Sequence, residues 1–104
     1  MSEGALVWIT GLPSSGKSTF ARSVRALLEA RGRSAFVLDG DEVRAALVPA
    51  PGFDDAARDD FYATLAGLAA LLVRQGATVL VPATANRRAY RDRARGLVAR
   101  FLEV

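Results

Sequence analysis

Four short apolar segments recur along the chain, at 5–10, 34–38, 78–82 and 101–104. Each has the length of a strand, and the first three are nearly continuously apolar, which is typical of strands buried on both faces. The segments between them carry apolar residues at helical spacing instead. The pattern therefore predicts alternating strands and helices, which favours a parallel sheet covered by helices on both faces.

Glycines mark where two of the predicted helices end. Gly32 follows one helical pattern and Gly76 follows another, and both are expected stops. The longer helix carries one apolar stripe, which we interpret as core: Phe61, Leu65, Leu68, Leu72 and Val73. The predicted helices are about 17–31, a short helix from Asp41, about 55–75 and about 87–98, with a Pro/Gly loop at 48–53.

Residues 11–18 read Gly-Leu-Pro-Ser-Ser-Gly-Lys-Ser and fit the phosphate-binding loop G-x-x-x-x-G-K-[ST] between a strand and a helix. Backbone N–H groups in such a loop surround a polyphosphate, and the positive end of the helix faces it. Lys17 would reach the β- and γ-phosphates, and the Ser18 hydroxyl would ligate Mg²⁺. The cofactors expected are therefore ATP and Mg²⁺, and the expected nucleotide-binding residues are Gly11, Pro13, Ser14, Ser15, Gly16, Lys17, Ser18 and Thr19.

These signals predict a three-layer α/β/α fold of the P-loop NTPase type. Ligands of parallel sheets bind at the carboxyl ends of the strands. That rule brings 11–18, 39–41 and 83–86 to one edge. The 104 residues are expected to be the N-terminal portion of a single P-loop kinase domain, cut off after the start of a fourth strand at 101–104.

Composition narrows the chemistry. The chain has no Cys and no His, which excludes disulfides, thiolate metal sites and imidazole catalysis. Its formal net charge is +3, Lys17 is the only lysine, and six of the thirteen arginines lie within 87–100, while acidic residues gather in the middle of the chain. Phosphate-handling sites are commonly built from such Arg and Asp groups. We therefore expect a site of that kind and no nucleic-acid partner. No apolar run approaches the ~18 residues of a membrane span, and 1–4 does not resemble a signal peptide. The need for ATP favours the cytoplasm.

A second polar group follows the second strand. Asp39 ends that strand, so its carboxylate would face the γ-phosphate, where it accepts a proton from an attacking hydroxyl or orients Mg²⁺ through water. We therefore assign catalytic roles to Lys17 and Asp39 and metal binding to Ser18 and Asp39. Asp41 would cap the short helix or contact a substrate. Arg44, one turn further, is placed to bind an anion.

Several segments of the chain match one family pattern together: Trp8-Ile9-Thr10-Gly11-Leu12, the phosphate-binding loop, Leu38-Asp39-Gly40-Asp41 with Val43-Arg44, Gly52-Phe53 with Arg58, and Arg88 with Arg91-Asp92-Arg93 and Arg95. In these segments the chain resembles the adenylylsulfate (APS) kinases, over essentially all of its length. These enzymes phosphorylate the 3′-hydroxyl of adenosine 5′-phosphosulfate with ATP, and they are commonly dimers. The resemblance implies a substrate role for Asp41, Arg44, Phe53 and Arg58, with Phe53 stacked on the adenine.

Three departures from the family pattern concern the acceptor. Glu42 stands where the family has Asn, and 61–64 read Phe-Tyr-Ala-Thr where the family has Asn-Ile-Arg-Arg. Residues 83–86 read Ala-Thr-Ala-Asn in place of Phe-Ile-Ser-Pro, which removes an aromatic for the adenine and puts Ala85 where the family carries a phosphorylated Ser. The lost arginines favour a changed acceptor or a changed way of holding it.

The arginine-rich helix has two interpretations. Asn86 is expected as its N-cap, and Arg87 and Arg88 lie in a first turn where positive charge opposes the helix dipole. A bound anion would offset that, so Arg88 is a candidate for substrate phosphate. The alternative is a solvated basic face paired with Asp92 and Glu103.

The leading hypothesis is an APS kinase-type phosphotransferase with a small-molecule substrate. The alternatives are a P-loop kinase for another small hydroxyl compound, such as a sugar acid or an antibiotic, and an ATP-binding fragment without catalysis.

Overall fold

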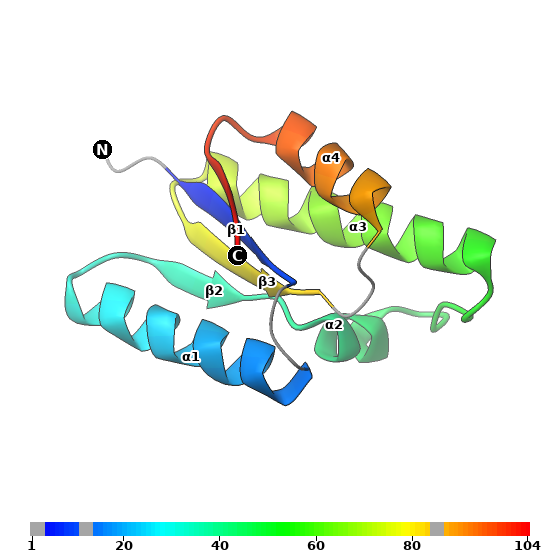
Figure 1. The fold of residues 1–104 in the computed structure, drawn as a ribbon, viewed down its shortest axis with the longest axis horizontal. Coiled ribbons are helices and arrows are strands. Elements are labelled where there is room, and N and C mark those ends of the chain that lie inside the picture. The colour runs from blue at the N-terminus through cyan, green and yellow to red at the C-terminus, as the bar shows by residue number, and fades with distance from the viewer. Residues whose placement is uncertain (1–3, 11–13, 84–86) are drawn as a thin grey trace.

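The computed structural model describes residues 4–10, 14–83 and 87–104, and within these ranges it is a four-stranded parallel sheet between two helical layers. The sheet order is β2-β3-β1-β4. Helix α1 lies on one face, and α3 and α4 lie on the other (Figure 1). In chain order the elements are β1 Ala5–Ile9, α1 Ser14–Ala30, β2 Ala35–Val37, α2 Gly40–Ala46, α3 Asp55–Arg74, β3 Thr78–Pro82, α4 Arg88–Leu97 and β4 Phe101–Glu103. The predicted α/β class and parallel sheet are confirmed.

Alternation along β1 divides the core into two clusters. Leu6 and Trp8 pack on the side of α3 and α4, whereas Ile9 packs with Ala21 of α1 and with Leu80 of β3. The cluster under α3 and α4 is much the larger, because those helices bring aromatic and aliphatic side chains from 61 to 94 onto the sheet. The larger cluster therefore fixes α3, from which part of the candidate site is built.

The apolar stripe predicted for α3 is mostly core. Phe61, Leu65 and Val73 are buried, and Leu72 is partly buried against them. The prediction is wrong for Leu68, which is 38% exposed. Small residues do the inward packing there instead, because Ala66, Ala69 and Ala70 are buried.

The helix ends follow the sequence signals with local differences. Gly32 and Gly76 have φ of 75° and 96°, a conformation that favours glycine, so both predicted stops are confirmed. Helix α1 begins at Ser14, three residues before the predicted start, so Gly16 and Lys17 belong to its first turn. Helix α4 has Arg87 at its N-cap position with no side-chain cap. The predicted cap Asn86 lies outside the described residues.

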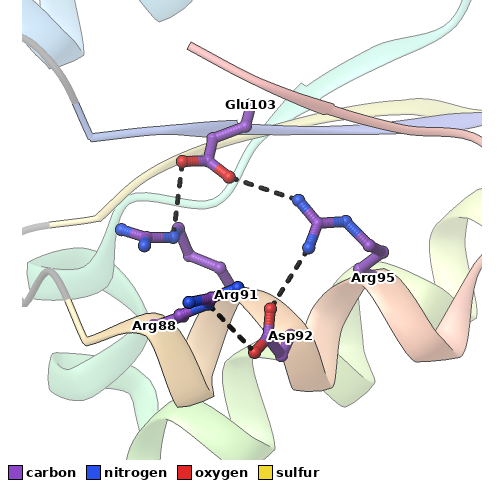
Figure 2. Close-up of polar contacts among 5 residues, drawn as sticks. All are labelled: Arg88, Arg91, Asp92, Arg95 and Glu103. Atoms are coloured by element: carbon purple, nitrogen blue, oxygen red, sulfur yellow. Dashed lines mark hydrogen bonds and ion pairs between the residues drawn. The ribbon is translucent and has the colours of Figure 1, made fainter.

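An ion-pair cluster attaches α4 to β4 (Figure 2). Glu103 of β4 pairs with Arg91 at 3.3 Å and with Arg95 at 3.3 Å. Asp92 pairs with Arg95 at 3.1 Å and with Arg88 at 3.8 Å. The predicted pairing of this basic face with Asp92 and Glu103 is therefore confirmed. Within the described part of the chain, no helix is both long and apolar enough to cross a bilayer.

Candidate functional site

The carboxyl ends of β1 and β2 bring the two predicted catalytic segments together. The Ser18 hydroxyl, in the first turns of α1, donates a hydrogen bond of 3.1 Å to Oδ2 of Asp39. The two residues are 21 positions apart in sequence, so the parallel sheet is what joins them. Lys17 is buried beside them in the first turn of α1. The predicted proximity of Asp39 to the phosphate-binding segment is confirmed.

Asp39 also caps α2, a role that we predicted for Asp41. Oδ1 of Asp39 accepts a 2.9 Å hydrogen bond from the backbone N–H of Asp41, and the extended backbone of Asp39 is that of an N-cap. Asp41 and Glu42 lie in the first turn, where negative charge complements the helix dipole. The predicted cap was two positions too far along the chain, because α2 starts at Gly40 and Asp41 already lies inside its first turn.

A cavity of about 290 Å³ lies next to Asp39. Its lining comes from α2, from the loop at 48–54 and from the first half of α3. It contains all four residues that the family resemblance assigned to the substrate: Asp41, Arg44, Phe53 and Arg58. The remaining lining residues are Gly40, Phe61 and Tyr62. The structure therefore gathers the candidate acceptor residues in one place.

Arg44 is the most constrained of these side chains. Its Nη1 donates to the carbonyl oxygens of Pro51 at 3.2 Å and Gly52 at 3.0 Å. The guanidinium carbon lies 4.5 Å from the ring centre of Phe53 and 4.3 Å from that of Phe61. Phe53 is 71% exposed, so its ring is not part of the core.

Phe61 and Tyr62 are pocket residues that the sequence reasoning missed, because their helical spacing marked Phe61 as core. Both are buried and also line the cavity. Their rings pack edge to face at 5.4 Å, and Tyr62 stacks on Tyr90 of α4 at 4.4 Å. The signal that could have found them was the departure from the family pattern at 61–64.

Tyr90 closes this aromatic stack with a strong hydrogen bond. Its hydroxyl donates to Oδ1 of Asp59 at 2.6 Å. Burial, and then the hydrogen bond and negative charge of Asp59, raise the pKa of the Tyr90 hydroxyl above its usual value. Tyr90 is thus held in its protonated form.

Arg88 lies outside the cavity lining and pairs with Asp92 on its own helix. At the same end of α4, Arg87 contacts Asp55 at 3.3 Å and Asp59 at 4.0 Å, so carboxylates of α3 supply negative charge there.

Gly11, Pro13 and Asn86 lie outside the described residues, as does Ala85. A larger hollow of about 1130 Å³ opens at the opposite edge of the sheet, near the amino ends of the strands and away from these groups.

Comparison with known proteins identifies the family and agrees with the α/β fold. The family model described as "Adenylylsulphate kinase" matches residues 3–104. The chain belongs to the adenylylsulphate kinase family. Its relatives include an adenylyl-sulfate kinase of Microcystis aeruginosa, which is 42% identical over 97% of this chain and 56% of that protein. The chain thus spans about half the length of the curated relatives that it matches.

Solved structures of the family superpose closely. The APS kinase of Mycobacterium tuberculosis, solved in complex with AMPPNP and APS, is 40% identical with a TM-score of 0.88, over 99% of this chain and 62% of that one. A hexameric APS kinase from Thiobacillus denitrificans is 33% identical with a TM-score of 0.85, over 98% of this chain and 22% of that one. A gluconokinase from Sinorhizobium meliloti, at 22% identity and a TM-score of 0.64, shares the fold.

Proposed function

We propose that the protein is an adenylyl-sulfate kinase, which transfers the γ-phosphoryl group of ATP to the 3′-hydroxyl of adenosine 5′-phosphosulfate in sulfate assimilation. One observation carries the proposal: the candidate acceptor residues line a single cavity that begins at Gly40, the residue after Asp39, and Asp39 itself accepts a hydrogen bond from Ser18 of α1. Residues 1–104 would be the N-terminal portion of one kinase domain, and the activity is proposed for the protein that contains it.

Nucleotide binding would rest on 11–19. The N-terminal N–H groups of α1 and the positive end of its dipole would face a bound polyphosphate. The buried ammonium of Lys17 would neutralise the β- and γ-phosphates from within that turn.

The residues near the phosphate-binding segment fit Mg²⁺. Ser18 and Asp39 supply hard oxygen donors 3.1 Å apart. Among the described residues, no group of three or more His, Cys, Asp or Glu side chains is placed to hold a metal ion. Mg²⁺ is usually bound through one or two protein ligands together with substrate phosphates and water, which is the arrangement that we propose. When bound, Mg²⁺ would offset the charge on the β- and γ-phosphate oxygens. Ser18 would ligate it, and Asp39 would orient it through water.

Phosphoryl transfer depends mostly on positioning and charge neutralisation, so the acceptor pocket matters as much as any acid or base. Phe53 would stack on the adenine, because its ring is exposed at the mouth of the cavity. Arg44 and Arg58 would hold the phosphosulfate, and Asp41 would contact the acceptor. Asp39 would accept the proton of the attacking 3′-hydroxyl if its carboxylate is not engaged with the metal. Arg88 stays a candidate for substrate phosphate only if Asp92 releases it.

The observation that favours another acceptor is the aromatic wall. Phe61 stands where the family has Asn, and Tyr62 where it has Ile, so two rings line this cavity and one polar group of the family pattern is lost from it. A P-loop kinase for a different small hydroxyl compound is therefore the second candidate. The need for ATP supports a cytoplasmic location, and family resemblance supports a homodimer.

The test measures ATP binding and phosphoryl transfer side by side on the purified protein, with APS as acceptor. The proposal expects 3′-phosphoadenylylsulfate to form in proportion to ADP. ATP binding without turnover would support a non-catalytic nucleotide-binding protein. ADP formation that requires a different hydroxyl compound would support the second candidate.

A further inference from the structure

Two aromatic rings and the hydrogen bonds of one nitrogen hold the guanidinium of Arg44 in place. Phe53 and Phe61 stack on it at 4.5 and 4.3 Å, and both carbonyl hydrogen bonds are accepted from Nη1 alone. A guanidinium has five N–H donors in a fixed fork. Among the described residues, Nε and Nη2 of Arg44 have no hydrogen-bond partner, although the side chain lines the cavity.

The two rings differ in how firmly they are anchored. Phe53 lies on an exposed loop, whereas Phe61 is 3% exposed and packs against Tyr62 in the core of α3. Phe61 is too buried to offer its face to a ligand in addition to Arg44. Its ring instead gives the guanidinium a rigid surface to stack on, and Arg stacks well on aromatic faces.

We propose that Phe61 is a positioning residue that fixes the plane of Arg44, so that Nε and Nη2 meet an anionic group of the acceptor as a preformed fork. This inference rests on the proposed function. The ligand group is a phosphate or sulfate, whose oxygens match that fork in a bidentate contact. Arg58 and Asp41 also line the cavity, which therefore carries two arginines and one carboxylate. Holding Arg44 in place lowers the entropic cost of binding, because a long side chain no longer has to be ordered by the ligand.

The experiment compares the protein with two variants, Phe61→Leu and Phe61→Tyr. Leu keeps an apolar side chain but removes the ring, and Tyr keeps the ring. Equilibrium affinities are measured for APS and for adenosine, which has no phosphosulfate, and ATP affinity reports the integrity of the fold. We expect Phe61→Leu to weaken APS binding about tenfold, the scale of a partly desolvated cation–π contact. Adenosine and ATP affinities should change less than twofold, and Phe61→Tyr should bind APS as the wild type does.

Three results would overturn the inference, and they are distinct. Equal APS affinity in the wild type and Phe61→Leu would remove the positioning role and leave the proposed function intact. An equal loss for APS and adenosine would make Phe61 a general wall of the cavity. No APS binding by the wild type would reject the proposed function, and the positioning role with it.

A measurement on the wild type alone covers the case in which Phe61→Leu fails to fold. The Nε–Hε group of Arg44 gives its own resonance in a nitrogen–proton correlation spectrum. Stacking on two rings predicts an upfield ring-current shift of Hε, which should persist in Phe61→Tyr. An Hε resonance at the position of a free arginine would overturn the inference.

Discussion

Asp39 combines two roles that two substitutions can separate. Its Oδ1 caps α2 through the N–H of Asp41, and its Oδ2 accepts the Ser18 hydroxyl. Asparagine caps helices about as well as aspartate but carries no charge. Alanine neither caps the helix nor carries a charge. Asp39→Asn should therefore keep the cap and lose the chemistry, and Asp39→Ala should lose both.

The expected magnitudes follow from these contacts. Loss of an N-cap costs about 1 kcal/mol, and loss of a partly buried hydrogen bond costs about the same. Asp39→Ala should therefore lower the free energy of unfolding by about 1–2 kcal/mol, and Asp39→Asn by less than ~0.5 kcal/mol. Both should lower kcat about a hundredfold or more, which is the usual contribution of a positioned acid–base or metal-orienting carboxylate.

The assay for stability is urea unfolding followed by tryptophan fluorescence, because Trp8 is the only tryptophan and is fully buried. Activity is followed by the formation of 3′-phosphoadenylylsulfate. Wild-type turnover in Asp39→Asn would refute a role for the negative charge. Unchanged stability in Asp39→Ala would refute the capping role.

Three further substitutions test the packing around the site. The raised pKa of Tyr90 keeps its hydroxyl protonated in the folded state. The free energy of unfolding should therefore fall as pH rises above about 10, where the unfolded chain releases that proton. Tyr90→Phe should remove this contribution to the alkaline fall in the free energy of unfolding. Glu103→Gln breaks one exposed ion pair, with Arg95, and one with the partly buried Arg91, and it should cost about 1 kcal/mol, an effect that shrinks in high salt. Gly67→Ala places a Cβ with no atom within 4 Å in the interior of α3 and should stabilise the protein by about 0.5–1 kcal/mol.

Each of these has a contradicting result, all measured by the same urea unfolding. An identical alkaline slope in Tyr90→Phe would mean that the hydroxyl is not held by burial and Asp59. A loss in Glu103→Gln that persists in high salt would point to packing and not to charge. A destabilised Gly67→Ala would mean that this face of α3 is covered.

The sequence predicted the sheet and the helix ends because both depend on local chemistry. Apolar runs of strand length fixed β1 and β3, and glycines with positive φ ended α1 and α3 as expected. The association of Ser18 with Asp39 was also predictable, since the ends of parallel strands share one edge.

The acceptor pocket was predictable only in part. The resemblance supplied Asp41, Arg44, Phe53 and Arg58, but helical spacing alone could not distinguish a buried Phe61 that only fills the core from one that also holds Arg44. The capping of α2 by Asp39 was missed for a related reason. The sequence alone does not distinguish an aspartate that ends a strand from one that caps the helix after it.

The most direct test of the account follows a labelled γ-phosphoryl group from ATP in the presence of APS. We predict that the label appears on the 3′-oxygen of the adenosine 5′-phosphosulfate, and that Lys17→Ala abolishes the transfer. Label that never reaches this oxygen, or transfer that is unaltered in Lys17→Ala, would contradict it.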